Sequence, residues 1–361
     1  MKHSNPLLRE SVGQKFLTFG EIMLRLTPPN YEKIRLANSF EASYGGSEAN
    51  IALALANLGV DSTFFSVVPN NSLGKSAVRM LRSNNVHCTP VILSSPEETP
   101  THRLGSYYME AGYGIQPSKV TYDRKHSAIT EFDFSQVDLG VLLEGFEWLH
   151  LSGITPALSP SCAKFTLDCM KMAREKGITV SFDGNFRSKL WNWEEARDFC
   201  TQCLPYVDVL LGIEPYHLWK DEEDHSKGDW KDGVPFHPSY EQQDEVFQHF
   251  VERYPNLKCI ARHVRHAYTG SENSLMAYMW YSGHTFESRL FTFNILDRVG
   301  GGDAFASGLI YAMMNNYKPM DMVNFAVASS VIKHAIRGDG NITDDVESIL
   351  NLVNMNYDIK R

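Results

Sequence analysis

The chain has 361 residues, enough for one large α/β domain or two ordinary ones, and its hydrophobic fraction of 43% can supply a sizeable buried core. A formal net charge of −9 argues against a general nucleic-acid-binding protein, which normally carries a basic stripe. No apolar run approaches the roughly 18 residues of a membrane span, and the N-terminal residues lack the apolar segment of a secretory signal. We therefore expect a cytoplasmic protein with neither nucleic-acid nor membrane partners.

The six cysteines are scattered along the chain, which favours a reduced, cytoplasmic protein. Cys200 and Cys203 form a C-x-x-C pair, but no second pair is present to complete a zinc site. We interpret them as two thiols on one helix face, and the sequence leaves the residues that hold any metal unknown.

Strand-like apolar runs alternate with helix-like stretches along the chain. Residues 15–26 are typical of a strand, and 47–59 of a helix closed by a glycine. Further strands are expected at 62–68, 146–153, 177–185, 207–213 and 257–264, with helices such as 73–85 and 162–177 between them. This alternation predicts an α/β fold with a mostly parallel sheet covered on both faces, and ligands bound beyond the carboxyl ends of its strands.

Two segments interrupt the alternation. Residues 97–128 contain many aromatic residues and little helical pattern, and together with 25–45 they are expected to form a small β-layer that projects as a lid. Residues 220–243 are polar and rich in charge, as in a solvated loop. We expect an N-terminal tail at 1–15 and a single α/β domain at 16–361 that includes both lid segments.

In the segment "DRVGGGDAF", residues 297–305, three glycines lead directly into an acid and a helical stretch. Bare backbone lets a ligand approach closely, and the free N–H groups and dipole at a helix start favour an anion such as a phosphate. Asp303 could simply cap the helix, but a carboxylate beside a phosphate is unfavourable unless it has a chemical task, such as accepting a proton from an attacking hydroxyl. Other phosphate motifs fail, because a P-loop requires glycine where Pro69 stands and no G-x-G-x-x-G follows the first strand.

Two segments of this chain resemble the signatures of a known family. "YGGSEANIALALANLG", a glycine pair with an asparagine soon after, is similar to the N-terminal signature of the ribokinase-like (PfkB) sugar kinases. "DRVGGGDAF" is similar to their second signature, D-T-x-G-A-G-D, and lies about 250 residues further on, in the expected order. Other stretches from about residue 16 onward, including "FGEIMLRLTPP", "LHLSGITP" and "KHAIRGDG", resemble the members that phosphorylate 2-keto-3-deoxygluconate.

The resemblance implies a fold and a reaction. The fold would be a ribokinase-like central sheet between helices, with a β-lid that closes over the sugar and often pairs with a second subunit, giving a homo-oligomer. The reaction would transfer the γ-phosphoryl group of ATP to the 6-hydroxyl of 2-keto-3-deoxy-D-gluconate, with Mg²⁺. A small sugar acid and ATP would therefore be the binding partners.

The resemblance also implies roles for individual residues. Asp303 matches the catalytic base, and the N–H groups of Gly300, Gly301 and Gly302 match the anion hole that stabilises charge on the transferred phosphoryl group. Arg187, in "DGNFRSKLW", matches the arginine that binds the sugar carboxylate, because its fork makes two hydrogen bonds. The other residues that match sugar-binding positions are Gly46, Tyr107, Tyr122, Arg124 and Asp339. From residue type alone, lid packing for the tyrosines and a surface salt bridge for Arg187 stay open.

The chain departs from the family in the nucleotide half of the site. Many relatives carry N-x-x-E after the strand at 207–213, whereas this chain has Ile213 and Tyr216 in those places and only Glu214 is acidic. The glycine-rich nucleotide loop is not evident near "ARHVRHAYTGSEN". Glu214 and Arg265 are the candidates to bind the nucleotide beside Gly300 and Gly302, and the residues that handle Mg²⁺ and the adenine pocket are left open.

Two alternatives remain open at the level of sequence. One is a ribokinase-like kinase of a neutral ketose, a nucleoside or a different sugar acid, which the paired cations Arg124 and Arg187 argue against. The other is a non-catalytic binding protein with this fold, which the departures at Ile213 and Tyr216 suggest and the intact Asp303 opposes. The sequence does not distinguish 2-keto-3-deoxygluconate from its 4-epimer, nor does it give the oligomer's size or the pathway.

Overall fold

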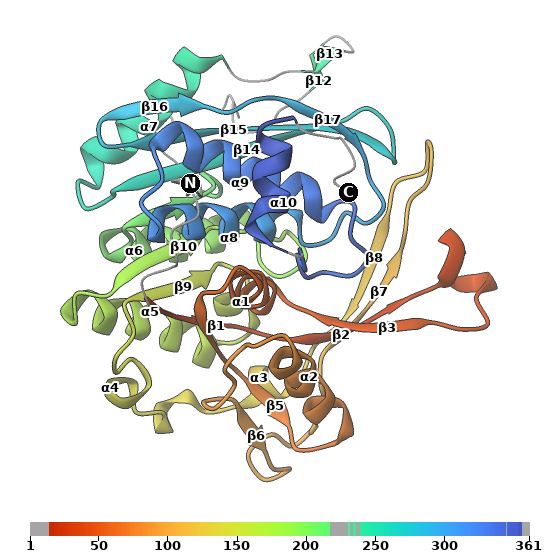
Figure 1. Cartoon of the computed structure of the whole chain (residues 1–361). Helices are drawn as coiled ribbons and strands as arrows, with labels where there is room; N and C mark the ends of the chain where they lie inside the picture. The colour runs from red at the N-terminus through yellow and green to blue at the C-terminus, as the bar shows by residue number, and fades with distance from the viewer. Residues whose placement is uncertain (1–13, 217–229, 232–233, 236–238, 344, 356–361) are drawn as a thin grey trace, which may run out of the picture.

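A computed structural model describes residues 14–216, 230–231, 234–235, 239–343 and 345–355. At its centre lies a nine-stranded sheet in the order β16-β15-β14-β11-β10-β9-β1-β4, with β17 paired to β15 (Figure 1). Its parallel strands are β1 (Lys15–Phe19), β4 (Asp61–Phe65), β9 (Trp148–Ser152), β10 (Thr179–Asp183), β11 (Val209–Leu211) and β14 (Cys259–Ala267). The antiparallel edge consists of β15 (Glu272–Tyr281), β16 (His284–Glu287) and β17 (Phe291–Asn294). The predicted α/β class and mostly parallel sheet are confirmed.

Helices cover both faces of this sheet, as Figure 1 shows. One face packs against α1 (Ser47–Asn57), α8 (Gly301–Met314), α9 (Pro319–Lys333) and α10 (Val346–Val353). The other face packs against α5 (Pro160–Glu175), α6 (Trp193–Cys203) and α7 (Tyr240–Arg253). Successive strand residues point to opposite faces, so Val209 and Leu211 belong to the first core and Leu210 to the second. A strand buried on both faces is mostly apolar, which is why these runs could be recognised in the sequence.

A second sheet, which we call the small sheet, has the order β3-β2-β7-β8 and extends away from the body of the molecule (Figure 1). Its strands are β2 (Met23–Thr27), β3 (Glu41–Gly45), β7 (Ser106–Glu110) and β8 (Lys119–Asp123). The segments 25–45 and 97–128 thus pair with one another as expected, with β2 parallel to β7 and the other pairs antiparallel.

The remaining elements lie around these two sheets. The helices are α2 (Ser72–Ser83), α3 (Ala128–Glu131) and α4 (Leu139–Leu142), and the paired short strands are β5 (Val67–Pro69) with β6 (Ile92–Ser94) and β12 (Trp230–Lys231) with β13 (Val234–Pro235). Five 3-10 turns span Pro29–Tyr31, Ile34–Leu36, Phe134–Gln136, Thr155–Leu158 and Leu204–Tyr206. None of the helices described here is long and apolar enough to cross a membrane.

Two strand predictions need correction. The run at 15–26 is two strands, because the chain leaves the main sheet at Gly20, where a side chain would clash with the Glu48 carboxylate at 2.3 Å, and enters the small sheet as β2. The run at 62–68 likewise divides into β4 and β5. The expected tail at 1–15 and loop at 220–243 fall largely outside the described residues, although β1 begins at Lys15 and α7 at Tyr240.

Candidate active site

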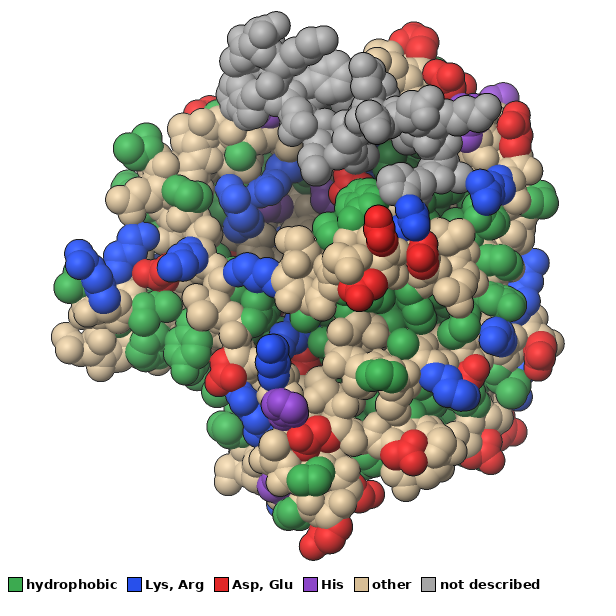
Figure 2. All heavy atoms as spheres, turned by 180° about the vertical axis from the view of Figure 1, so that it is seen from behind, with side chains coloured by type: hydrophobic (Ala, Val, Ile, Leu, Met, Phe, Trp, Pro, Cys, Tyr) green, Lys and Arg blue, Asp and Glu red, His purple; other side chains and the backbone are tan. Residues whose placement is uncertain are grey.

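A cleft of about 1310 Å³ lies between the small sheet and the carboxyl ends of the parallel strands. It is reached by the starts of α1 and α8 and by the segments that follow β1, β10 and β11. Figure 2 shows a hollow on this side of the molecule in which basic side chains gather. Every candidate residue named from the sequence lines this cleft: Gly46, Tyr107, Tyr122, Arg124, Arg187, Glu214, Arg265, Gly300, Gly301, Gly302, Asp303 and Asp339.

Asp303 lies in the first turn of α8 and is held by two donors from the start of α1. Ser47 Oγ donates to one carboxylate oxygen and Asn50 Nδ2 to the other, each over 2.7 Å. Burial raises the pKa of Asp303, and the hydrogen bonds from Asn50 and Ser47 and the nearby Arg187 oppose that rise. The carboxylate is therefore oriented toward the cleft by two fixed donors, as a proton acceptor must be.

The three glycines before Asp303 have different structural causes. Gly300 has a positive φ of 84°, and a Cβ there would lie 1.9 Å from the backbone oxygen of Asp339. A Cβ on Gly301 would lie 2.5 Å from the His334 ring. A Cβ on Gly302 would meet only His263, at 3.7 Å, which is ordinary contact. Protein packing thus accounts for the first two glycines but leaves Gly302 unexplained, as expected where a ligand approaches a helix start.

Two further acids lie close to Asp303 and were missed in the sequence. Burial raises the pKa of Glu48 and of Asp183 to about 7 each, and the charge of Asp303 adds to both shifts. Glu48 accepts hydrogen bonds from Ser152 and Thr155, at 2.6 and 2.8 Å. Both acids could have been suspected, since Glu48 lies two residues after the glycine pair of the first signature and Asp183 lies near the carboxyl end of the strand predicted at 177–185.

Arg187 follows β10 and is exposed in the cleft. Its Nη1 donates a hydrogen bond to the backbone oxygen of Phe186, at 3.2 Å, and no carboxylate within the described ranges forms an ion pair with it. Its charge is felt by Asp183 and Asp303, whose pKa values it lowers. Arg187 is therefore a cation available to an acidic ligand.

Arg124 also lines the cleft, but its charge is already compensated. It forms a buried ion pair with Glu21 and donates from Nε to the same carboxylate over 2.8 Å. Ser127 Oγ donates to the other Glu21 oxygen at 2.6 Å. The Arg124 guanidinium lies 5.6 Å from the centre of the half-exposed Tyr122 ring. The expected pair of cations is thus one available arginine and one that is tied to the base of the small sheet.

Tyr107 and Asp339 meet one another at the back of the cleft. The Tyr107 hydroxyl donates to Asp339, whose other oxygen accepts from Arg25 over 2.7 Å. Gly46 stands before α1, where a Cβ would lie 1.9 Å from the backbone oxygen of Glu21. The structure brings all three to the cleft, with Tyr107 and Asp339 nearly fully buried.

One part of the cleft lining is basic. Arg265 and Arg298 have no ion pair among the residues described, and Arg298 Nε is buried without a hydrogen-bond partner there. Burial lowers the pKa of Arg265 to about 10, and the charge of Arg298 adds to this shift. Burial lowers the pKa values of His263 and His334 to about 4, so both rings are neutral at pH 7. Two arginines in the cleft that the start of α8 also lines have the chemistry to bind a multiply charged anion.

Comparison with known proteins agrees with this geometry. Residues 14–215 match the pfkB family of carbohydrate kinases. This chain belongs to that family. A 2-dehydro-3-deoxygalactonokinase from Haloferax volcanii is 30% identical over 93% of this chain and 96% of its own. The crystal structure of 2-dehydro-3-deoxygluconokinase from Thermotoga maritima superposes with a TM-score of 0.85, at 35% identity over 94% of this chain and 99% of its own. The crystal structure of a putative 2-keto-3-deoxygluconate kinase from Enterococcus faecalis superposes with a TM-score of 0.85, at 26% identity over 97% of this chain and 99% of its own.

The positions after β11 that were singled out in the sequence separate into core and cleft residues. Ile213 and Tyr216 are buried in the core, where Tyr216 packs against Phe250 with ring centres 5.7 Å apart. Glu214 is left at the cleft, with Arg262 at 3.9 Å. The described residues include no cluster of three or more His, Cys, Asp or Glu side chains suited to a metal ion.

In this PfkB kinase, Gly302→Ala is expected to lower kcat/KM for ATP by roughly tenfold or more, because a displacement of a reacting group by about 1 Å is costly. The melting temperature should stay level or rise, since the new Cβ meets no close neighbour and alanine favours the helix. Steady-state kinetics and thermal unfolding measure the two effects. Gly301→Ala is the matched control, because its Cβ would clash with His334 and should lower stability first. If Gly302→Ala lowered stability and activity in parallel, packing rather than ligand approach would explain this glycine.

Proposed function

We propose that this kinase transfers the γ-phosphoryl group of ATP to the 6-hydroxyl of 2-keto-3-deoxy-D-gluconate. The observation that carries the proposal is Arg187, an exposed cation without a carboxylate partner in the described structure, in the same cleft as Asp303. A carboxylate that leaves water for a closing cleft must be paired and hydrogen-bonded, and Arg187 offers both. The similar proteins from Haloferax volcanii and Thermotoga maritima are named as kinases of 2-dehydro-3-deoxy sugar acids, which supports the same substrate class.

Asp303 is proposed as the general base. Ser47 and Asn50 each donate to it, so a lone pair of the carboxylate can accept the proton of the attacking hydroxyl. As the hydroxyl oxygen bonds to the γ-phosphorus, the bond to the leaving ADP oxygen breaks. The N–H groups at the start of α8, including that of Gly302, would stabilise the charge on the transferred group. With the C1 carboxylate at Arg187, the far end of the six-carbon acid presents its C6 hydroxyl.

The nucleotide is proposed to bind at the basic part of the cleft lining. Arg265 and Arg298 would bind its phosphates, and the partnerless Nε of Arg298 is the donor that this assignment explains. Mg²⁺ would supply neutralising charge on the phosphates, and Glu214, which lines the cleft, would contribute one carboxylate toward holding it.

A neutral ketose is the second candidate substrate. It is favoured by one observation, that Glu21 compensates the charge of Arg124 and leaves Arg187 as the available member of the expected arginine pair. A single arginine could equally serve a hydroxyl-rich sugar, although its fork suits a carboxylate better.

A coupled assay of ADP formation with 2-keto-3-deoxygluconate, 2-keto-3-deoxygalactonate, fructose and ribose tests the proposal. We expect kcat/KM for the two sugar acids to exceed that for the neutral sugars by about 10²-fold, the worth of a charged, bidentate contact. The ratio of kcat/KM between the two sugar acids measures how strongly the enzyme distinguishes the orientation of the C4 hydroxyl. A preference for fructose or ribose would replace the proposal with the second candidate, and no turnover with any sugar would reject both.

A further inference from the structure

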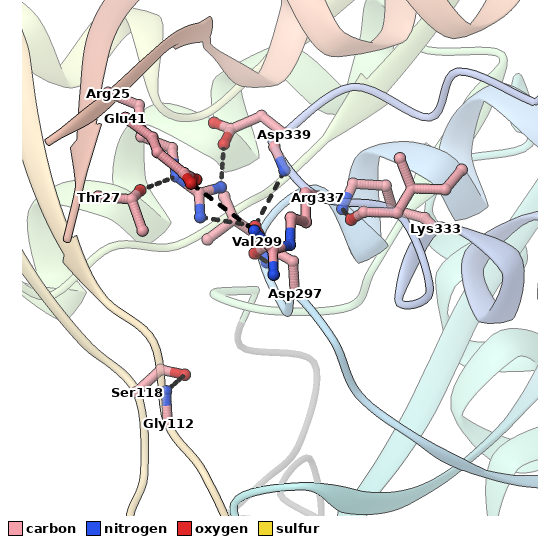
Figure 3. A network of polar contacts seen from close by, with 12 residues as sticks. Arg25, Thr27, Glu41, Gly112, Ser118, Asp297, Val299, Lys333, Arg337 and Asp339 are labelled. Atoms are coloured by element: carbon pink, nitrogen blue, oxygen red, sulfur yellow. Dashed lines mark hydrogen bonds and ion pairs between the residues drawn. The ribbon is translucent and has the colours of Figure 1, made fainter. Parts of the chain in front are cut away.

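Arg25 lies at the centre of a buried ion network that joins the small sheet to the body of the protein (Figure 3). From β2, its Nη2 contacts Asp297 Oδ2 at 2.6 Å and its Nη1 contacts Asp339 Oδ1 at 2.7 Å. The three side chains are 3–7% exposed. Nε donates to Thr27 Oγ1 at 2.9 Å. The guanidinium fork is thus bonded on all sides, and each arm holds a different carboxylate.

Both carboxylates control the segment that carries the glycines. Asp297 Oδ1 accepts from the backbone N–H of Val299 at 3.2 Å, and Asp297 Oδ2 accepts from that of Gly338 at 3.0 Å. The backbone oxygen of Asp339 packs so closely on Gly300 that no side chain fits there. Asp297 thus holds Val299, the residue before Gly300, and Asp339 packs directly on Gly300. Both acids that Arg25 binds therefore position this segment.

The charges in this network require the arginine. Burial lowers the pKa of Arg25, but the carboxylates of Asp339 and Asp297 raise it by more, so the side chain is charged at every working pH. Lys333 is buried nearby, and its ammonium donates to the backbone oxygen of Ile336 at 3.0 Å. Without the guanidinium, two carboxylates would be buried with Lys333 as the nearest remaining cation, which is a costly arrangement.

Other contacts from the small sheet converge on the same segment. The Tyr107 hydroxyl, from β7, donates to Asp339. Glu41, from β3, lies 3.7 Å from Arg337 in an exposed ion pair. Among the contacts described, Arg25 alone reaches both Asp297 and Asp339, so it is the link between the sheet and both sides of Gly300.

We infer that Arg25 is a positioning residue for phosphoryl transfer, which aligns the N–H groups of Gly300 to Gly302 with the sugar-binding face of the small sheet. This inference rests on the proposed function, because it assumes that these N–H groups meet the transferred group. Arg25 itself is not among the residues that line the cleft, so we expect it to contact neither substrate. Its loss should therefore lower kcat through misalignment while leaving both binding steps nearly intact.

Arg25→Lys is the first test. An ammonium keeps the charge but cannot reproduce a fork that bonds two carboxylates. We expect kcat to fall by roughly tenfold or more, with KM for ATP and for the sugar acid changed by less than about threefold. Arg103→Lys is the matched control, because Arg103, which precedes β7, is partly exposed and pairs with Asp123 of β8 at 2.9 Å, and no contact described joins it to the Asp297 segment. Its kcat should equal that of the parent.

A double-mutant cycle separates positioning from general damage. Asp297→Asn alone should lower kcat as Arg25→Lys does. The double variant should be no less active than the poorer single variant, because both substitutions disrupt the same contact between Arg25 and Asp297. If Arg25→Lys is not recovered folded, Asp297→Asn carries the kcat and KM comparison by itself.

Additive losses in the cycle would overturn the inference, as would an unchanged kcat in Arg25→Lys or a loss confined to KM for the sugar. An inactive parent protein would instead reject the proposed function, so the two failures are distinguishable.

Discussion

Asp303→Asn is expected to lower kcat by roughly 10²–10⁴-fold, the usual worth of a positioned general base. The amide keeps the size of the side chain and can still accept from Ser47, so the fold and ATP binding should persist. Kinetics with 2-keto-3-deoxygluconate and calorimetric ATP binding measure the two effects. Asp345→Asn is the control, because Asp345 caps the exposed start of α10 and lies outside the cleft. Turnover within a few-fold of the parent would exclude Asp303 as the base.

The pH profile gives the same residue an independent test. Asp303 must be ionised to accept a proton, so activity should be lost as pH falls through its pKa. Because burial raises that pKa above the ordinary value of 3.8, the acid limb of kcat/KM should lie at higher pH than an exposed aspartate would give. The residual activity of Asp303→Asn should lack this limb, and a limb that survives the substitution would belong to another group, with Glu48 and Asp183 the nearest candidates.

Arg187→Ala is expected to reduce kcat/KM for the sugar acid by on the order of 10²-fold, because a bidentate, charge-assisted contact is lost. Affinity for ATP should change little, since Arg265 and Arg298 are the arginines proposed to bind its phosphates. Arg187→Lys should recover only part of the loss, because a point charge cannot reproduce the fork. Steady-state kinetics with each substrate varied in turn check both expectations.

Arg197→Ala is a suitable control, since Arg197 lies on α6, pairs with Asp198 at 2.8 Å and is absent from the cleft. An equal fall in kcat/KM for a sugar acid and for fructose in Arg187→Ala would show that Arg187 does not bind the carboxylate.

The sequence was sufficient for features that depend on local pattern. Strands buried on both faces are mostly apolar, so the six parallel strands could be recognised, and the cleft at their carboxyl ends followed from the topology. The edge strands β15, β16 and β17 were missed, although the ten residues of β15 are mostly apolar. The division between β1 and β2 was missed too, because it depends on the contact of Gly20 with Glu48.

Charge compensation could not be predicted, because it depends on contacts between distant residues. Glu21 lies 103 residues from Arg124, and Arg25 lies 314 residues from Asp339. Nothing in the type of either arginine indicates whether a carboxylate will face it. The three adjacent glycines are indistinguishable in the same way, since only the positions of Asp339 and His334 show which of them packing requires.

The Asn50 amide ties two distant parts of the chain together. Its Nδ2 donates to Asp303 at 2.7 Å, while its Oδ1 accepts from the backbone N–H of Gly46 at 3.3 Å. Each end of the amide thus has one partner, so the group cannot be turned over without losing both contacts. In a hybrid assembled from two parental kinases with a crossover anywhere between residues 50 and 303, one parent would supply the amide and the other the acid. Such chimeras can work only where the two parents place helices α1 and α8 in the same register.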